Sequence, residues 1–89
     1  MRRSLNYKHL HYFWVVARAG GITRAAEKLN LTPQTLSGQV KQLEESVGVA
    51  LFTPVGKRLE LTEAGRVAYS YADEMFSLAA ELGEALKSL

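Results

Sequence analysis

The amino-acid sequence predicts a mainly α-helical domain that carries a small β-hairpin and ends in a long helix, and three observations lead to this prediction. Apolar residues recur at the three- and four-residue spacing of helix faces through residues 7–47. The pattern then changes to alternation at residues 58–61, which is typical of a strand. A regular apolar repeat resumes at Ala64 and continues to Leu89. The length of 89 residues allows one small domain with an appendage.

The first two predicted helices occupy residues 7–19 and 24–29. The apolar face of the first is formed by Leu10, Phe13, Trp14 and Ala17. Gly20 and Gly21 end this helix, because glycine readily adopts the left-handed conformation that follows a helix C-terminus. Thr23 is the predicted N-cap of the second helix, in which small residues allow close packing.

The third predicted helix spans residues 33–47 and has two contrasting faces. Thr32 is its predicted N-cap, and Pro33 suits the first helical position, where a missing N–H has no cost. The face expected to pack in the core is formed by Leu36, Val40, Leu43 and Val47. The opposite, polar face is formed by Gln34, Ser37, Gly38, Lys41, Gln42 and Glu45.

A β-hairpin is predicted after Gly48. Leu51 and Phe52 are expected in its first strand, and residues 58–61 form the second. A turn at residues 55–57 joins the strands and places basic residues at its tip. Pro54 restricts the first strand to an edge or to a very short pairing.

The last predicted helix begins after its N-cap, Thr62, and contains about 27 residues, which corresponds to a length of ~40 Å. Its apolar residues follow a seven-residue repeat: Ala64, Ala68, Tyr71, Met75, Leu78, Leu82, Ala85 and Leu89. A helix of this length exceeds what a domain of about 60 residues covers with its own core. We therefore expect these residues to contact a second copy of the chain; the alternative is a helix folded back on its own domain.

Charge is distributed unevenly along the chain. Residues 1–59 contain nine Lys and Arg and three Glu, which gives a net charge of +6. Residues 60–89 contain two Lys and Arg and six Asp and Glu, which gives a net charge of −4. A basic N-terminal part suits a polyanionic partner, because cations that approach phosphates release condensed counterions. An ordinary solvated surface with uneven charge explains the same numbers equally well.

The order of elements is that of a winged helix-turn-helix, in which the second helix of the pair enters the DNA major groove. Gln34 can bond an adenine edge, Ser37 can donate or accept a hydrogen bond, and the Thr35 methyl group suits a thymine methyl group. Gly38 costs about 1 kcal/mol in a helix interior, which favours close approach of another surface. The predicted contacts to double-stranded DNA are Thr23, Thr32, Pro33, Gln34, Thr35, Ser37, Gly38, Lys41, Lys57 and Arg58.

Each of these residues taken alone is also typical of a solvated surface, so the prediction depends on their combination. Catalysis is not expected, because no nucleophile or phosphate-binding loop motif is present. No cofactor or metal is expected either: the chain has no cysteine, and His9 and His11 are two apart and lie on different helix faces. The alternative function is a non-catalytic winged-helix module for protein–protein interaction. The lack of cysteine and of an apolar run of ~18 residues suggests a cytoplasmic protein.

The run ITRAAEKLNLTPQTLSGQVKQLEESVGVALFTPVGKRLELTEAG resembles the N-terminal domain of LysR-type transcriptional regulators, and the likeness extends over about residues 5–89. The elements that carry it are Ala25-Ala26, Leu29, Leu36-Ser37, Gln39, Leu43-Glu44, Gly48, Leu51-Phe52 and Leu61-Thr62-Glu63-Ala64-Gly65. Four further motifs look most like the branch that activates sodium/proton antiporter genes: Tyr12-Phe13-Trp14, Thr32-Pro33-Gln34-Thr35, Gly38-Gln39 and Tyr71-Ala72-Asp73.

This resemblance implies a winged helix-turn-helix over residues 1–61 and a linker helix over residues 62–89 that pairs two chains. It also implies that the dimer binds an interrupted inverted repeat near a promoter. Family members continue into a C-terminal domain, absent from this chain, that binds a small-molecule effector and completes a tetramer.

Two departures from the family pattern bear on DNA contacts. Many members have a larger, often basic residue in place of Gly38, so the specificity of this chain should differ from theirs. Many also have an acid and an arginine where this chain has Thr53 and Pro54, which transfers wing contacts to Lys57 and Arg58.

Overall fold

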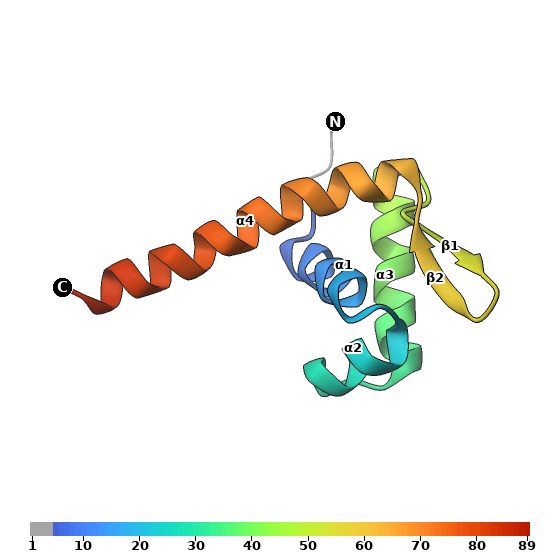
Figure 1. The fold of residues 1–89 in the computed structure, drawn as a ribbon, viewed down its shortest axis with the longest axis horizontal. Coiled ribbons are helices and arrows are strands. Elements are labelled where there is room, and N and C mark those ends of the chain that lie inside the picture. Colours follow the sequence, from blue (N-terminus) through green and yellow to red (C-terminus); the bar gives the residue numbers. More distant parts are fainter. Residues whose placement is uncertain (1–4) are drawn as a thin grey trace.

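The computed structural model describes residues 5–89, so Arg2 and Arg3 lie outside the described residues. Within this range the chain forms four helices and one two-stranded antiparallel sheet (Figure 1). In chain order the elements are α1 (Tyr7–Ala19), α2 (Ile22–Leu29), α3 (Pro33–Val47), β1 (Phe52–Val55), β2 (Arg58–Leu61) and α4 (Glu63–Lys87). The predicted fold class, a mainly α-helical winged helix-turn-helix, is confirmed.

Local capping residues explain where the helices begin and end. Thr32 Oγ1 accepts a hydrogen bond from the Thr35 N–H at 3.1 Å, which caps α3 as predicted. Thr62 Oγ1 accepts from the Gly65 N–H at 2.9 Å and caps α4. At the end of α3, Gly48 has φ +80°, a conformation that glycine adopts without steric cost.

The predicted N-cap role of Thr23 is wrong. Helix α2 begins two residues earlier than predicted, at Ile22, with Gly21 in the N-cap position and no side-chain capping bond. Ile22 packs against the buried residues between α1, α2 and α3, so an earlier helix start gains apolar burial. Thr23 instead lies exposed in the first turn of α2.

The hairpin is also shifted from its predicted position. Leu51 precedes β1 and is buried in the core, 3% exposed, instead of lying in the strand. Val55 pairs with Arg58, so the turn consists of Gly56 and Lys57. Pro54 is accommodated in β1 because both strands of a two-stranded sheet are edge strands.

The core consists of two adjoining clusters. One lies between α1, α2 and α3 and contains Val16, Ala25, Ala26, Leu36 and Val40. The other lies between α1, α3 and α4 and contains Leu10, Phe13, Leu43, Leu51, Ala72 and Phe76. The predicted core face of α3 is therefore confirmed, with Val47 packed beside it. The buried face of α1 extends further than predicted, because Val16 is also in the core.

Helix α4 divides into a packed part and a projecting part. Up to Phe76 it lies across the domain, and Gly65, Ala72 and Phe76 are buried. From residue 77 onward every residue is exposed, and the helix extends away from the other elements (Figure 1). The helix has 25 residues, fewer than predicted, and Leu89 lies beyond its end. Among residues 5–89, no helix has the length and apolarity needed to cross a bilayer.

Candidate nucleic-acid interface

Helices α2 and α3 form the helix-turn-helix. The small buried side chains of Ala25 and Ala26 pack in the same cluster as Leu36 and Val40, which brings the two helices close together. Asn30, with φ +61°, provides the left-handed residue that ends α2. Because the apolar face of α3 is held in the core, its opposite face is directed to solvent.

The exposed face of α3 contains most of the predicted DNA contacts. Five of them are exposed on the first two turns or just before them: Thr32, Pro33, Gln34, Thr35 and Gly38. Ser37 is half-buried, and Lys41 is exposed one turn further along. The Gln34 side-chain amide makes no hydrogen bond within the described chain, so both its donor and its acceptor are available.

Two hydrogen bonds join Thr32 and Thr35 at the start of α3. The Thr32 hydroxyl accepts from the Thr35 N–H and donates to the Thr35 hydroxyl at 2.9 Å. The Thr32 hydroxyl thus already donates one hydrogen bond and accepts another within the cap of α3. The predicted contact of Thr32 with a phosphate would therefore depend on an oxygen or N–H outside this bond pair.

Gly38 is not required by the packing of its own chain. A Cβ atom built at this position meets no atom within 4 Å, and its backbone conformation is ordinary helix. Glycine therefore occupies a helix-interior position at which alanine would stabilise the helix by about 1 kcal/mol. This supports close approach of an external surface to the backbone.

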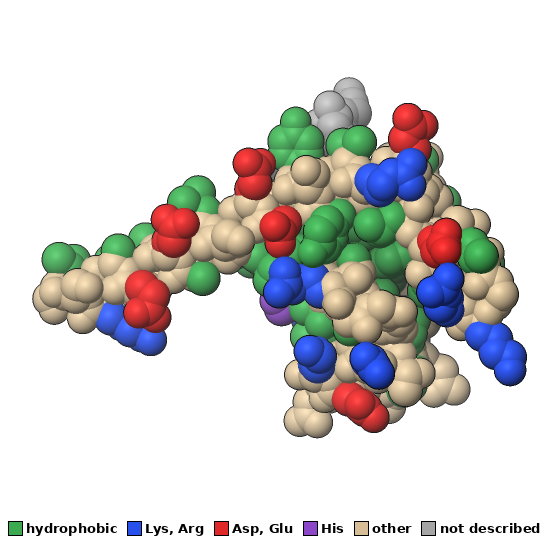
Figure 2. Space-filling view, in the orientation of Figure 1, with side chains coloured by type: hydrophobic (Ala, Val, Ile, Leu, Met, Phe, Trp, Pro, Cys, Tyr) green, Lys and Arg blue, Asp and Glu red, His purple; other side chains and the backbone are tan. Residues whose placement is uncertain are grey.

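The hairpin carries the other basic candidates. Lys57 lies in the turn, is exposed, and has no ion pair among residues 5–89. Arg58 Nη2 lies 3.5 Å from a Glu60 carboxylate oxygen, and both side chains are largely exposed. Lys and Arg side chains predominate over the lower helices and the hairpin, while acidic side chains are spaced along α4 (Figure 2).

A groove connects α3 to the hairpin. Ser37 and Lys41 line one side of it, and Pro54 and Leu59 line the other. A ligand that contacts the exposed face of α3 beside this groove also meets the hairpin, so the two elements can act on one partner.

Glu44 fixes the position of the hairpin relative to α3. Its Oε2 atom accepts hydrogen bonds from the backbone N–H groups of Leu51, at 2.7 Å, and Phe52, at 3.1 Å. This role of Glu44 is not predicted from the sequence. One signal was present, because an acid in the last turn of a helix is disfavoured by the helix dipole unless it has a partner.

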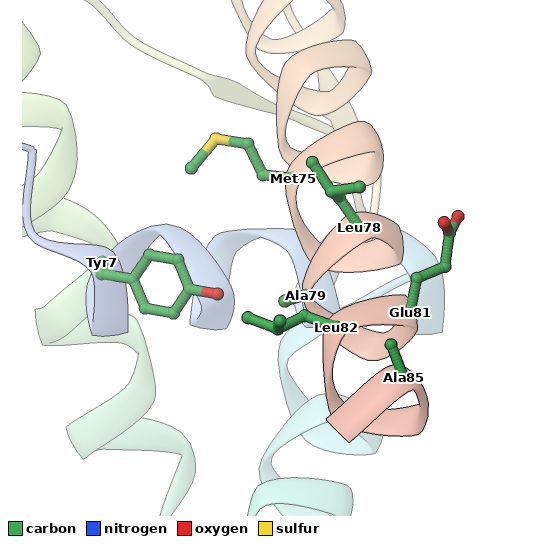
Figure 3. Close-up of a pocket in the computed structure, with 7 residues that line it drawn as sticks. All are labelled: Tyr7, Met75, Leu78, Ala79, Glu81, Leu82 and Ala85. Atoms are coloured by element: carbon green, nitrogen blue, oxygen red, sulfur yellow. The ribbon is translucent and has the colours of Figure 1, made fainter. Parts of the chain in front are cut away.

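The projecting part of α4 presents an apolar face to solvent. Tyr7, from α1, lines a groove together with Met75, Leu78 and Leu82, and Figure 3 shows Met75 and Leu82 on the side of α4 that faces Tyr7. The large exposed apolar side chains of α4 and its end are Val67, Tyr71, Met75, Leu78, Leu82, Leu86 and Leu89. Their spacing of 4, 4 and 3 residues is an 11-residue repeat. The first two residues of the predicted seam, Ala64 and Ala68, instead pack partly against the core of their own domain.

No group of three or more His, Cys, Asp and Glu suited to a metal ion occurs among residues 5–89. The site consists instead of the polar face of α3 beside a hairpin with exposed basic residues.

Comparison with known proteins places this geometry among regulators. Residues 7–66 match the family model described as "Bacterial regulatory helix-turn-helix protein, lysR family". The transcriptional activator protein NhaR of Escherichia coli (strain K12) is 49% identical over 78 residues, which cover 88% of this chain and 26% of NhaR. The chain thus spans about a quarter of the length of that relative.

The fold is shared by solved structures of other proteins. The crystal structure of BenM DBD with catB site 1 DNA has a TM-score of 0.86 and 30% identity, with 93% of this chain and 92% of that chain covered. The crystal structure of CbnR, a LysR family transcriptional regulator, has a TM-score of 0.81 and 30% identity, with 93% of this chain and 29% of that chain covered.

Proposed function

Because the chain belongs to the lysR family of bacterial regulatory helix-turn-helix proteins, we propose that it binds double-stranded DNA sequence-specifically and regulates transcription. The observation that carries this proposal is the exposed, uncharged polar face at the start of α3, which lies beside a hairpin with exposed basic residues. The complex of BenM DBD with DNA, which shares the fold, supports it. We propose no catalytic role and no cofactor.

In this function α3 enters the major groove. Gln34 reads an adenine edge, Ser37 and Thr35 contact neighbouring bases, and Gly38 lets the backbone approach. The residues proposed to contact the DNA backbone are Thr23, Thr32, Pro33, Lys41, Lys57 and Arg58. Of the wing residues, Lys57 is the stronger candidate, because Arg58 already has Glu60 as a partner.

We propose that two chains associate through the exposed apolar face of α4. Residues such as Leu78 and Leu82 are 65% and 59% exposed in the single chain, and burial of these side chains would favour association. A dimer presents two recognition helices, so its target is an interrupted inverted repeat. Residues 1–61 would then form the DNA-binding unit and residues 62–89 the linker.

Relatives such as NhaR are about four times as long as the region that matches this chain. We propose that a C-terminal domain binds an effector and completes a tetramer. Such a regulator acts where the bacterial chromosome lies, in the cytoplasm.

The deciding experiment selects genomic DNA fragments with the 89-residue chain at physiological salt. Enrichment of an interrupted palindrome is the expected result. A folded, dimeric chain that enriches no sequence would contradict sequence-specific binding by this part alone, and would favour a protein-interaction module. Selection with a longer chain then tests whether the C-terminal part is needed to set half-site spacing.

A further inference from the structure

Two motifs that the DNA contacts do not use meet in space. Trp14, on α1, donates a hydrogen bond from its Nε1–H to Asp73 Oδ1, on α4, at 3.1 Å. The two residues are 59 positions apart in the sequence, and the bond is partly buried. We propose that this hydrogen bond fixes the direction of α4 relative to its domain and thereby selects the spacing between DNA half-sites. The second step rests on the proposed function.

Apolar packing alone does not define this direction. The Phe76 ring lies among three aromatic side chains of α1, with ring centroids 5.0 Å from each of Tyr7, His11 and Trp14. Burial of apolar surface is non-directional, so we expect these contacts alone to define the direction of α4 less sharply than a hydrogen bond does. A hydrogen bond weakens steeply as its angle closes, so the indole N–H and Asp73 allow much less variation.

Arg18 has an accessory role at the same place. Its guanidinium lies over the Trp14 ring, 4.8 Å from the centroid, and its Nη1 is 3.5 Å from Asp73 Oδ1. The Arg18 and Asp73 side chains are 55% and 45% exposed, so water screens the ion pair. The bond from Trp14 is therefore the more directional of the two contacts to Asp73, and it does not depend on the exposed Arg18 pair.

The bond between Trp14 and Asp73 lies just before the point where α4 leaves the domain, so it can affect the direction of the whole projecting part. Phe76, one turn after Asp73, is the last buried residue of α4, and everything beyond it is exposed. The remaining length from Phe76 to Lys87 is about 16 Å, so a tilt of about 10° moves the helix end by about 3 Å. Successive bases along one DNA strand are about 3.4 Å apart. In a dimer joined through α4, we expect a tilt of this size in each protomer to shift the two recognition helices relative to each other on the scale of a base-pair step.

Four variants separate this role from general packing. Trp14→Phe keeps the aromatic ring against Phe76 and removes only the N–H donor. Asp73→Ala removes the acceptor, whereas Asp73→Asn keeps Oδ1 and should retain the bond. Arg18→Gln is the matched control, because it removes the ion pair and leaves the Trp14 bond intact.

The direction of α4 is measured first, without DNA. The chain has no cysteine, so Glu27→Cys on α2 and Glu84→Cys on α4 allow specific spin labelling. Labelled chain diluted with unlabelled chain gives the distance distribution within one protomer by double electron–electron resonance. We expect one narrow distribution for the parent, Asp73→Asn and Arg18→Gln, and a broader or displaced one for Trp14→Phe and Asp73→Ala. Unchanged distributions in the last two variants, with circular dichroism confirming their fold, would overturn the proposal.

Spacing is measured with a library of duplexes that carry the same half-sites separated by every spacer length. We expect Trp14→Phe and Asp73→Ala to accept or prefer a different spacer while their affinity for a single half-site stays unchanged. The same spacer preference in all variants would overturn the spacing claim. If the parent chain itself selects no sequence, the proposed function fails together with the spacing claim, and the spin-label distances still decide whether the bond directs α4.

Discussion

The α-carbon of Gly65 lies against the backbone carbonyl of Leu51, so closely that a Cβ atom at position 65 would overlap the carbonyl oxygen. This approach lets the start of α4 bind the connection that precedes the hairpin. The Thr62 hydroxyl donates to the Ala50 carbonyl at 2.7 Å, and the Thr62 N–H donates to the Leu51 carbonyl at 3.0 Å. Glycine at position 65 is therefore a packing requirement.

Replacement of Gly65 by alanine should destabilise the domain. Because the obstructing atoms belong to the backbone, the first turn of α4 must shift, and we expect a loss of about 1–3 kcal/mol in the free energy of unfolding. Urea denaturation measures this loss. Gly38→Ala is the matched control, since its Cβ atom meets nothing and alanine favours the helix. Equal stability of the two variants would show that α4 does not need the close approach.

Gly38→Ala should separate stability from binding. In the free chain we expect about 1 kcal/mol of added stability from helix propensity. Affinity for the selected DNA site should fall, because the new methyl group occupies space that the DNA backbone or bases would use. Fluorescence anisotropy with the cognate duplex measures the affinity. An unchanged affinity would mean that α3 does not approach DNA through Gly38.

Gln34→Ala should reduce affinity for the cognate site by ~1–3 kcal/mol and have little effect on random DNA. The reason is that its exposed amide has no hydrogen-bond partner among residues 5–89 and can form two bonds with one adenine. Parallel titrations of cognate and scrambled duplexes test this. A similar loss on both duplexes would assign Gln34 to backbone contact instead of base reading.

Lys57→Ala should weaken binding to all sequences alike. If Lys57 neutralises one phosphate, the slope of log affinity against log salt should become shallower by about one unit. Arg58→Ala should change the slope less, because Glu60 already competes for the guanidinium. Titrations over a salt series give both slopes. No change in the Lys57 variant would place the hairpin away from the DNA.

Leu78→Asp combined with Leu82→Asp should yield monomers, because the two charges would have to be buried in the contact between chains. Both positions are exposed in the single chain, so its fold should persist. Analytical ultracentrifugation reports the mass, with Ala80→Asp, on another exposed face of α4, as a control. Dimers that survive the double substitution would place the interface elsewhere.

The arrangement of the exposed apolar residues also bears on that contact. A seven-residue repeat imposes a left-handed supercoil, whereas an 11-residue repeat leaves helices nearly straight or slightly right-handed. The sequence alone suggested the former, because Ala64, Ala68 and Ala85 complete a seven-residue pattern. In the structure, Ala64 and Ala68 are partly buried against their own domain, and the large exposed apolar residues follow the 11-residue repeat.

Features that depend on near neighbours in the chain were predictable from the sequence. The Thr32 and Thr62 caps each involve a residue three positions away, and the apolar face of α3 follows directly from its periodicity. The exposed candidates Gln34 and Lys41 follow in turn, since they lie opposite that face.

Features that depend on distant partners were not predictable in this way. Helix α4 has a second apolar face, which contains Ala72 and Phe76, and periodicity does not reveal which face meets the domain. The bond between Trp14 and Asp73 joins residues from opposite ends of the chain. The start of α2 was misplaced because the burial of Ile22 outweighed the capping preference of Thr23.

The connection between α3 and the hairpin is clamped from both sides, by Glu44 and by Thr62, and both clamps bind backbone atoms. The side chains of residues 49–52 are thus not what these bonds recognise. Exchange of the exposed residues of α3 for those of another regulator should then leave the hairpin in register, provided that Glu44 and Thr62 are kept. The domain should therefore accept the DNA specificity of another regulator without a change in the position of its hairpin.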